Sequence, residues 1–276
     1  MTELPPYDLP PHVAAFLSPT STRLVLHRRG STVWDVRSAA GRYALKLGFP
    51  ASPTHEWTAL APAREVSVLR ALGRGDVFEG RWDRGTWGVQ PWRTGESLWD
   101  RWAPVRESAT PPPLADAAAC AAALAELHAR GWAHGDVQPA HLLVLATRAD
   151  LIDLALALGG DIPPEVDFPF RGCLVHYEAP ELSRSVLDTG HAVPTPEADV
   201  YALGASLLIS ATGRRAVVYP DDAPRVEQRQ AIVEGRYRDV TVPGPLGPLV
   251  DAMLSPKPGD RPTAGEVHAA MATMPG

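Results

Sequence analysis

Apolar residues in the first third of the chain alternate with polar ones and are interrupted by short glycine-containing turns. From residue 22 to residue 47, valine, tyrosine and leucine side chains flank turns at residues 29–31 and 40–42. Runs of β-favouring residues between turn signals are typical of antiparallel strands. The same pattern returns at residues 78–81 and 86–92. This part of the sequence therefore predicts a meander of short antiparallel strands.

A helical period interrupts these strands once. Val66, Leu69 and Leu72 form one apolar stripe, Pro62 precedes it, and Gly73 follows it. Apolar residues three residues apart share one face of a helix, and glycine just past the last apolar residue is a common stop signal. The pattern predicts one main helix packed against the strands.

The pattern changes near residue 93, after which helix signals dominate, apart from a loop-rich stretch at residues 159–171. We expect an N-terminal extension at residues 1–20, a strand-rich lobe at residues 21–93 and a mostly helical lobe at residues 94–276. The predicted fold class is α+β with two lobes, and a cleft between such lobes would suit a ligand.

Composition narrows the possible partners. The chain has 276 residues, is 45% hydrophobic and carries a formal net charge of −6. It can bury a sizeable core, but it lacks the basic surface that nucleic-acid binding requires. Cys120 and Cys173 lie far apart and predict neither a disulfide framework nor a zinc site.

Nothing in the sequence indicates a membrane or secreted protein. Residues 1–12 are acidic and proline-rich, unlike a signal peptide. No apolar run reaches the roughly 20 residues that span a bilayer. The longest weakly polar stretch, residues 114–127, reads as a buried alanine-rich helix. We expect no nucleic-acid or membrane partner and a cytoplasmic location.

Two short strings carry the chemistry. Asp136 lies in the string His134-Gly135-Asp136, and Asp153 follows the apolar pair Leu151-Ile152. Phosphoryl transfer uses two such acids, one to orient a hydroxyl group and one to hold a cation against the phosphates. Taken alone, each string is also compatible with an ordinary turn or strand end.

Further matches in a fixed order make the chain resemble the protein kinase superfamily, as a eukaryotic-like bacterial kinase with a His-Gly-Asp catalytic-loop variant. The matching positions run from the first lobe to the C-terminus. They are Ala44-Leu45-Lys46, Glu65, Asp136, Asp153, Ala179-Pro180-Glu181, Asp199 and Arg261. The resemblance implies a bilobal kinase-like fold, with a small antiparallel sheet and one main helix in the first lobe.

The resemblance also implies roles for the four central residues. Lys46 would bind the phosphates of ATP while Glu65 holds its ammonium group, and the alternative is an exposed surface pair. Asp136 would be the catalytic carboxylate. Asp153 would bind Mg²⁺ or Mn²⁺, since hard cations prefer carboxylate oxygens. Arg261 would form a structural ion pair with Glu181.

The expected nucleotide site includes several other positions in the first lobe. They are Gly30, Ser31, Thr32, Val33, Ala44, Gln90 and Trp92. The phosphate loop has one glycine where the family pattern has three, so fewer backbone amides can approach the phosphates. The Ser31 and Thr32 hydroxyl groups could donate hydrogen bonds in their place.

Two departures from the family pattern reach the chemistry. Gln138 stands at the position of the catalytic-loop lysine and removes a positive charge from the reacting phosphoryl group. His141 stands at the position of the asparagine that binds a metal, and imidazole suits Mn²⁺ better than Mg²⁺. A metal-binding His141 would be neutral, so acid would compete with the cation below about pH 6.5.

The expected function is ATP-dependent phosphorylation of serine or threonine in a protein or peptide. One alternative is a pseudokinase that acts with a partner, favoured by Gln138, His141 and the sparse glycine loop. Another is a small-molecule phosphotransferase, favoured by the His-Gly-Asp string and Gln138. A narrower resemblance is to stand-alone kinase homologues of lanthipeptide-type biosynthesis, which implies a precursor peptide and a partner lyase.

Overall fold

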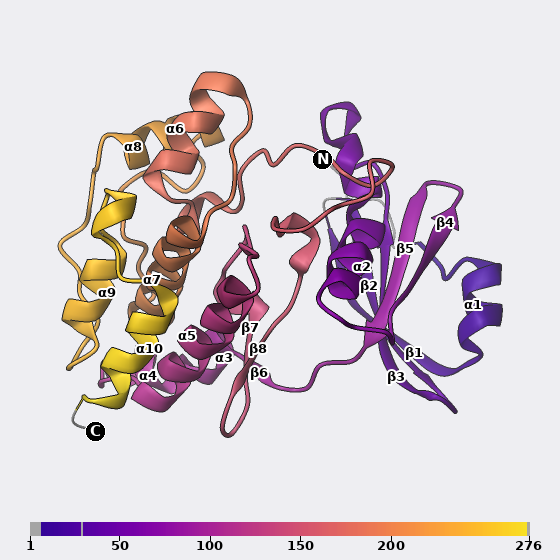
Figure 1. Cartoon of the computed structure of the whole chain (residues 1–276), viewed down its shortest axis with the longest axis horizontal. Helices are drawn as coiled ribbons and strands as arrows, with labels where there is room; N and C mark the ends of the chain where they lie inside the picture. Colours follow the sequence, from indigo (N-terminus) through magenta and orange to yellow (C-terminus); the bar gives the residue numbers. More distant parts are fainter. Residues whose placement is uncertain (1–6, 29, 275–276) are drawn as a thin grey trace. The chain divides into compact units, whose positions relative to one another are not determined.

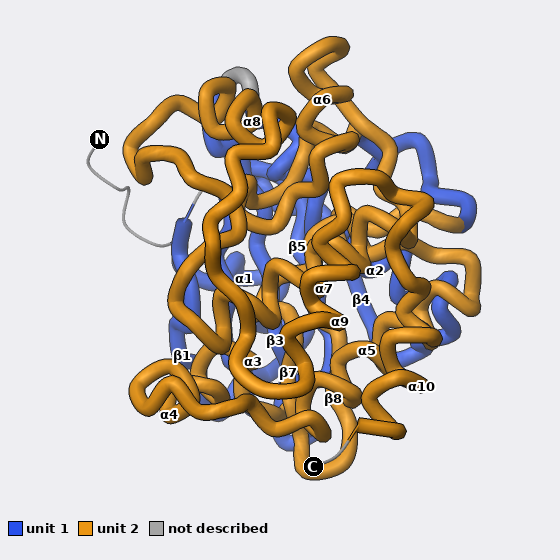
Figure 2. The backbone as a smooth tube through the Cα atoms, turned by 90° about the vertical axis from the view of Figure 1, so that its left-hand side faces the viewer, with its two compact units in different colours: residues 1–93, 160–168 blue, residues 94–159, 169–276 orange. Residues whose placement is uncertain are grey.

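The computed structural model describes residues 7–28 and 30–274. Residues 1–6 of the expected N-terminal extension and Arg29 of the first expected turn lie outside the described residues. The chain divides into two compact units (Figure 2). Unit 1 holds the described residues up to Arg93 together with Gly160–Phe168, and unit 2 holds Thr94–Gly159 and the described residues from Pro169 onward.

The strands form two antiparallel sheets (Figure 1). In the described part of unit 1, five strands pair in the order β1-β2-β3-β5-β4, and in unit 2 three short strands pair in the order β6-β7-β8. Their bounds are β1 Pro19–Arg28, β2 Ser31–Ser38, β3 Gly41–Gly48, β4 Phe78–Trp82, β5 Gly85–Pro91, β6 Glu96–Ser97, β7 Leu142–Val144 and β8 Ala149–Leu151. The predicted meander of antiparallel strands is confirmed for β1 to β3, whereas β5 rather than β4 pairs with β3.

The alternation along β3 assigns its side chains to the two faces of the first sheet. Leu45 and Leu47 are fully buried in an apolar cluster with residues of α1 (Pro11–Leu17). Lys46 points to the other face, and helix α2 (Ala61–Ala71) packs there. Because successive strand residues face opposite sides, a single charged residue can lie between two core leucines.

Helix α1 was not expected from the sequence, which reads as proline-rich at its start. Pro11 occupies the first turn, where its missing N–H costs nothing. Val13 and Leu17, four residues apart, bury their side chains against the sheet, and Ser18 ends the helix in a left-handed conformation. The two apolar residues were the available signal, but one turn of periodicity is too short to predict a helix.

Helices dominate unit 2, as the sequence predicts. Their bounds are α3 Leu98–Arg101, α4 Ala103–Ser108, α5 Leu114–Ala129, α6 Pro180–Thr189, α7 Pro196–Thr212, α8 Arg225–Val233, α9 Gly247–Met253 and α10 Ala264–Ala272. Helices α5 and α7 are largely buried, and α5 packs against α10. The α+β class is confirmed, and the architecture is compatible with a bilobal kinase-like fold.

The segment Gly160–Phe168 leaves unit 2 and packs within unit 1. The Arg64 guanidinium, on α2, lies 3.3 Å from the Asp167 carboxylate and over the Phe168 ring. The Phe168 ring also packs against Trp57, at 5.0 Å between ring centroids. The sequence predicts a loop here but not its attachment to α2, which depends on contacts across about a hundred residues.

Cys120 and Cys173 are both free and buried, so they form no disulfide bond with each other. Burial raises the pKa of the Cys120 thiol to about 12. None of the described helices combines the length and the hydrophobicity that a membrane crossing requires.

A buried ion pair fastens the chain before α6 to helix α8. Both Glu178 oxygens accept hydrogen bonds from Arg229, at 2.7 and 2.9 Å. Ser183 and the backbone N–H of Cys173 also donate to this carboxylate. Gly172 passes so close that a Cβ atom there would lie 2.3 Å from the Glu178 and Arg229 side chains. No local pattern in the sequence predicts this network.

We predict that Glu178→Gln destabilises the protein by about 3 to 5 kcal/mol, because it leaves the buried Arg229 guanidinium without its counter-charge. Chemical denaturation at neutral pH measures the loss. The matched control is Glu234→Gln, which removes the same kind of charge from the exposed pair with Arg236 and should change little. Equal effects of the two substitutions would contradict a structural role for Glu178.

Candidate active site

In unit 1, the predicted lysine and glutamate meet. The Lys46 Nζ atom on β3 lies 2.7 Å from the Glu65 Oε2 atom on α2. The side chains are 15% and 3% exposed, which excludes the exposed surface pair considered from the sequence. A buried charge needs a counter-charge, and each of these two groups supplies one for the other. The arrangement presents an ammonium group whose position is fixed by a helix.

The turn between β1 and β2 requires a glycine at position 30. Gly30 has φ +83°, and a Cβ atom there would lie 2.6 Å from the carbonyl oxygen of Phe49. The Thr32 side chain is fully buried, and its hydroxyl oxygen lies 2.7 Å from His27 Nδ1. That contact competes with the predicted use of Thr32 as a phosphate donor. Ser31 is partly exposed, and its role as a donor stays a prediction.

The remaining positions assigned to the nucleotide site lie on the strands of the same sheet. Val33 pairs with Lys46 across β2 and β3, and Ala44 pairs with Gln90 across β3 and β5. Trp92 follows β5, and the Arg42 guanidinium lies 4.4 Å from the centroid of its ring. Nucleotide contacts of these residues stay predictions.

In unit 2, a buried carboxylate holds the loop that carries Asp136. Asp199, in the first turn of α7, is 2% exposed and accepts hydrogen bonds from the backbone N–H groups of His134 and Gly135. Its Oδ2 atom also lies 3.0 Å from His128 Nε2. Gly135 has φ +77°, and a Cβ atom there would lie 2.7 Å from the Leu156 carbonyl oxygen. The His-Gly-Asp string therefore requires glycine for geometric reasons.

The His134 side chain connects this loop to the strand end before Asp153. Its Nδ1 atom accepts a hydrogen bond from the backbone N–H of Asp136, so Nε2 must carry the proton. Nε2 then donates to the carbonyl oxygen of Ile152 at 3.1 Å. Burial lowers the pKa of His134, in agreement with a neutral ring. The sequence pointed to the string but assigned no role to His134 or to Asp199.

Asp136 presents one oxygen that has no partner. Gln138 Nε2 donates to its Oδ2 atom at 3.0 Å. Its Oδ1 atom is buried, and within the described residues it accepts no hydrogen bond. Burial raises the pKa of Asp136 above its usual value, although the neighbouring His141 opposes the shift. A carboxylate with a raised pKa and an unused acceptor is suited to receive a proton from a hydroxyl group.

His141 lies between Asp136, the predicted catalytic carboxylate, and Asp153, the predicted metal ligand. Its Nδ1 atom donates to the Asp136 carbonyl oxygen at 2.9 Å, and its Nε2 atom lies 3.2 Å from Asp153 Oδ2. Both ring nitrogens are therefore donors, which describes an imidazolium. Burial alone would lower the pKa of His141, but the Asp153 carboxylate and the contacts with Asp136 raise it to about 9.

Asp153 has a backbone conformation that is rare for a residue with a side chain. Its φ and ψ are 63° and 57°, in the left-handed region. Such strain costs on the order of 1–3 kcal/mol and concentrates at functional sites. The Asp153 side chain is 41% exposed, so its carboxylate can reach a ligand.

The side chains available as metal ligands agree with a cation that is bound partly by the protein and partly by the substrate. No group of three or more His, Cys, Asp or Glu side chains in residues 7–28 and 30–274 is arranged to hold a metal ion. Mg²⁺ needs no such cage, because it is commonly bound by one or two carboxylates plus substrate phosphates. Asp153 fits that pattern. His141 would have to lose its Nε2 proton to become a ligand, and its metal role stays a prediction.

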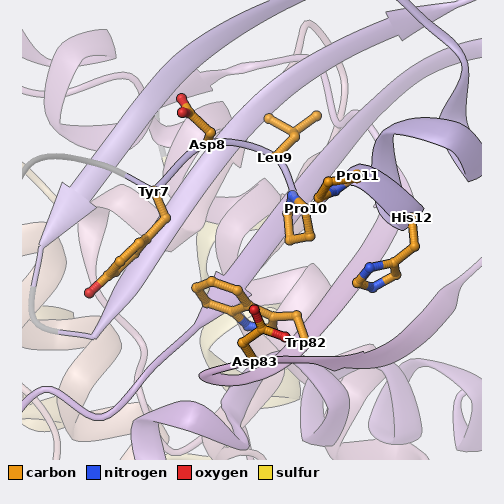
Figure 3. Close-up of a pocket in the computed structure, with 8 residues that line it drawn as sticks. All are labelled: Tyr7, Asp8, Leu9, Pro10, Pro11, His12, Trp82 and Asp83. Atoms are coloured by element: carbon orange, nitrogen blue, oxygen red, sulfur yellow. The ribbon is translucent and has the colours of Figure 1, made fainter.

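A separate pocket of about 230 Å³ in unit 1 lies beside the start of α1 (Figure 3). Tyr7, Trp82 and Asp83 contribute to its wall, together with residues 8–12. The Arg84 guanidinium already lies 4.9 Å from the centroid of the Tyr7 ring. The pocket includes none of the predicted site residues, so it is not the candidate active site.

Comparison with known proteins finds a partial similarity to a protein kinase. No family model matches it. It is 29% identical to mitogen-activated protein kinase kinase kinase 8 of Rattus norvegicus over 150 residues, which are 51% of this chain. The match covers 30% of that protein, so the chain spans less than a third of this relative. The similarity is therefore partial, and the relative is named as a kinase.

We predict that His141 stabilises the fold only while it is protonated. Its pKa in the folded protein is about 9, above the value of about 6.5 expected for an unfolded chain. Its contribution to stability is then complete below pH 6.5 and is lost as the pH rises through 9. Thermal melting of the parent and His141→Asn from pH 6 to 10 should show a difference that shrinks with pH. A constant difference would argue for a neutral His141.

Proposed function

We propose that the chain is an ATP-dependent phosphotransferase that phosphorylates a serine or threonine hydroxyl group of a protein or peptide. The observation that carries the proposal is the buried Oδ1 atom of Asp136, which has no hydrogen-bond partner among the described residues. A buried acceptor without a partner is costly unless a ligand supplies the donor. The hydroxyl group of a serine or threonine substrate can donate this hydrogen bond.

Each residue has a defined task in this reaction. Lys46, held by Glu65, neutralises charge on the phosphates of ATP. The acceptor oxygen forms a bond to the terminal phosphorus, the bond between that phosphorus and the ADP oxygen breaks, and Asp136 takes the hydroxyl proton. Asp153 would hold Mg²⁺ or Mn²⁺, which supplies charge neutralisation at the phosphates when bound. Catalysis of this kind depends on position and electrostatics.

The proposal that the substrate is a protein or peptide is based on sequence similarity. The relative is named as a protein kinase kinase kinase, and the Ala179-Pro180-Glu181 string belongs to the protein-kinase pattern. In the structure, Glu181 accepts two hydrogen bonds from Arg261, at 2.7 and 2.8 Å, so the predicted structural pair is present. Phosphorylation of a precursor peptide beside a partner lyase is a narrower proposal that rests on the resemblance alone.

One observation favours a second candidate, a nucleotide-binding protein without catalysis. The His141 imidazolium lies on the Asp153 carboxylate, where it competes with a cation. Gln138 is neutral where the family has a lysine. The two candidates differ in one measurable outcome, since both bind ATP but only the phosphotransferase forms ADP in the presence of an acceptor.

We predict that Asp136→Asn lowers turnover by about 10² to 10⁴, the range for a positioned acid or base. ATP-dependent thermal stabilisation should stay nearly unchanged, because the residue meets the acceptor rather than the nucleotide. The assay is ADP release with a mixture of serine- and threonine-containing peptides. Asp188→Asn, at an exposed position on α6, is the control and should keep full activity. Full activity of Asp136→Asn would remove Asp136 from the mechanism.

Lys46→Met and Asp153→Asn should both weaken ATP binding, for different reasons. The first removes the ammonium group that meets the phosphates, and the second removes the carboxylate expected to hold the cation. We expect the ATP-dependent rise in melting temperature to be largely lost in Lys46→Met, and its Mg²⁺-dependent part to be lost in Asp153→Asn. Lys257→Met, at an exposed position, is the control. Retention of the full rise in both variants would refute the site.

A further inference from the structure

Gln90, which the sequence assigns to the nucleotide site, directs its side chain to Glu65. Its Nε2 atom donates a hydrogen bond to Glu65 Oε1 at 3.1 Å. The Glu65 Oε2 atom is the one that meets Lys46, at 2.7 Å. The two carboxylate oxygens of Glu65 are therefore divided between a neutral donor and a charged donor.

The strand register explains how both donors reach the same carboxylate. On the neighbouring strands β3 and β5, Ala44 pairs with Gln90 and Lys46 pairs with Gly88. Residues two apart on a strand share one face, so Lys46 and Gln90 both point to the face that α2 covers. Gly88 allows the close approach of α2, because a Cβ atom there would lie 2.8 Å from the Pro62 carbonyl oxygen.

Two anchors constrain a carboxylate more than one does. Lysine is a point charge on a flexible stem, so the Lys46 contact sets a distance to the Glu65 carboxylate but not the orientation of the carboxylate plane. A second hydrogen bond from Gln90 fixes the carboxylate plane and, with it, the position of the Lys46 ammonium group. The Glu65 side chain is only 3% exposed, so water does little to replace either contact.

We propose that Gln90 is a positioning residue, which fixes the Glu65 carboxylate and through it the Lys46 ammonium group for phosphate binding. The inference rests on the proposed function. It differs from the assignment made from the sequence, in which Gln90 contacts the nucleotide itself. A positioning residue affects any ligand that uses Lys46, whereas a base contact affects only ligands that carry the base.

The experiment compares two ligands, each with Mg²⁺, in the parent and in Gln90→Leu, which has a similar size but no donor. Thermal-shift titration measures ATP binding, and competition with ATP measures the binding of inorganic tripolyphosphate, which has no base. We expect Gln90→Leu to weaken both ligands by a similar factor, about tenfold, since a hydrogen bond to a charged group is lost. Gln90→Glu, which adds a like charge beside Glu65, should weaken both further.

The control is a glutamine in unit 2 that also donates a hydrogen bond to a glutamate. Gln230 Nε2 donates to Glu234 Oε1 at 3.1 Å on the exposed side of α8, and Gln230→Leu should change neither affinity. Loss of ATP binding alone in Gln90→Leu would show a base contact and overturn the inference, and so would unchanged affinity for both ligands. A parent that does not bind ATP would instead overturn the proposed function, and the inference with it.

Discussion

The buried carboxylate of Asp199 is the constraint on which the candidate catalytic loop depends. It lies in the first turn of α7 and accepts two backbone hydrogen bonds from His134 and Gly135, immediately before Asp136. The His134 ring then carries the same constraint to the Ile152 carbonyl oxygen, one residue before the second acid. One helix thus fixes the backbone positions of two carboxylates that come from different segments, and a rigid support of this kind is what electrostatic catalysis requires.

Each unit contains charged side chains that pair at the candidate site, but the residue types differ between the units. In unit 1, a lysine and a glutamate share a buried ion pair, and Gln90 completes the environment of the glutamate. In unit 2, the His141 imidazolium lies between Asp136 and Asp153 and offsets part of their mutual repulsion. The neutral Gln138 keeps one Asp136 oxygen occupied and leaves the other without a partner.

The sequence predicted most of the fold but only part of the site. Strands and turns followed from local periodicity, and the Lys46–Glu65 pairing followed from the resemblance to the protein kinase superfamily. The roles of Asp199 and the protonation of His141 did not, because each depends on partners that are distant in sequence or on burial. The same holds for Gln90, whose strand was predicted but whose target required the packing of α2. Helix α1 was missed because two apolar residues carry too little periodic signal.

The activity proposed for this chain is phosphate transfer to a hydroxyl group. The most direct measurement is mass spectrometry of a mixed serine and threonine peptide library incubated with the protein, ATP and either Mg²⁺ or Mn²⁺. We expect phosphoserine or phosphothreonine in the library, with an equivalent amount of ADP formed. Binding of ATP with neither product, in either metal, would contradict the proposed activity and leave the chain as a nucleotide-binding protein without catalysis.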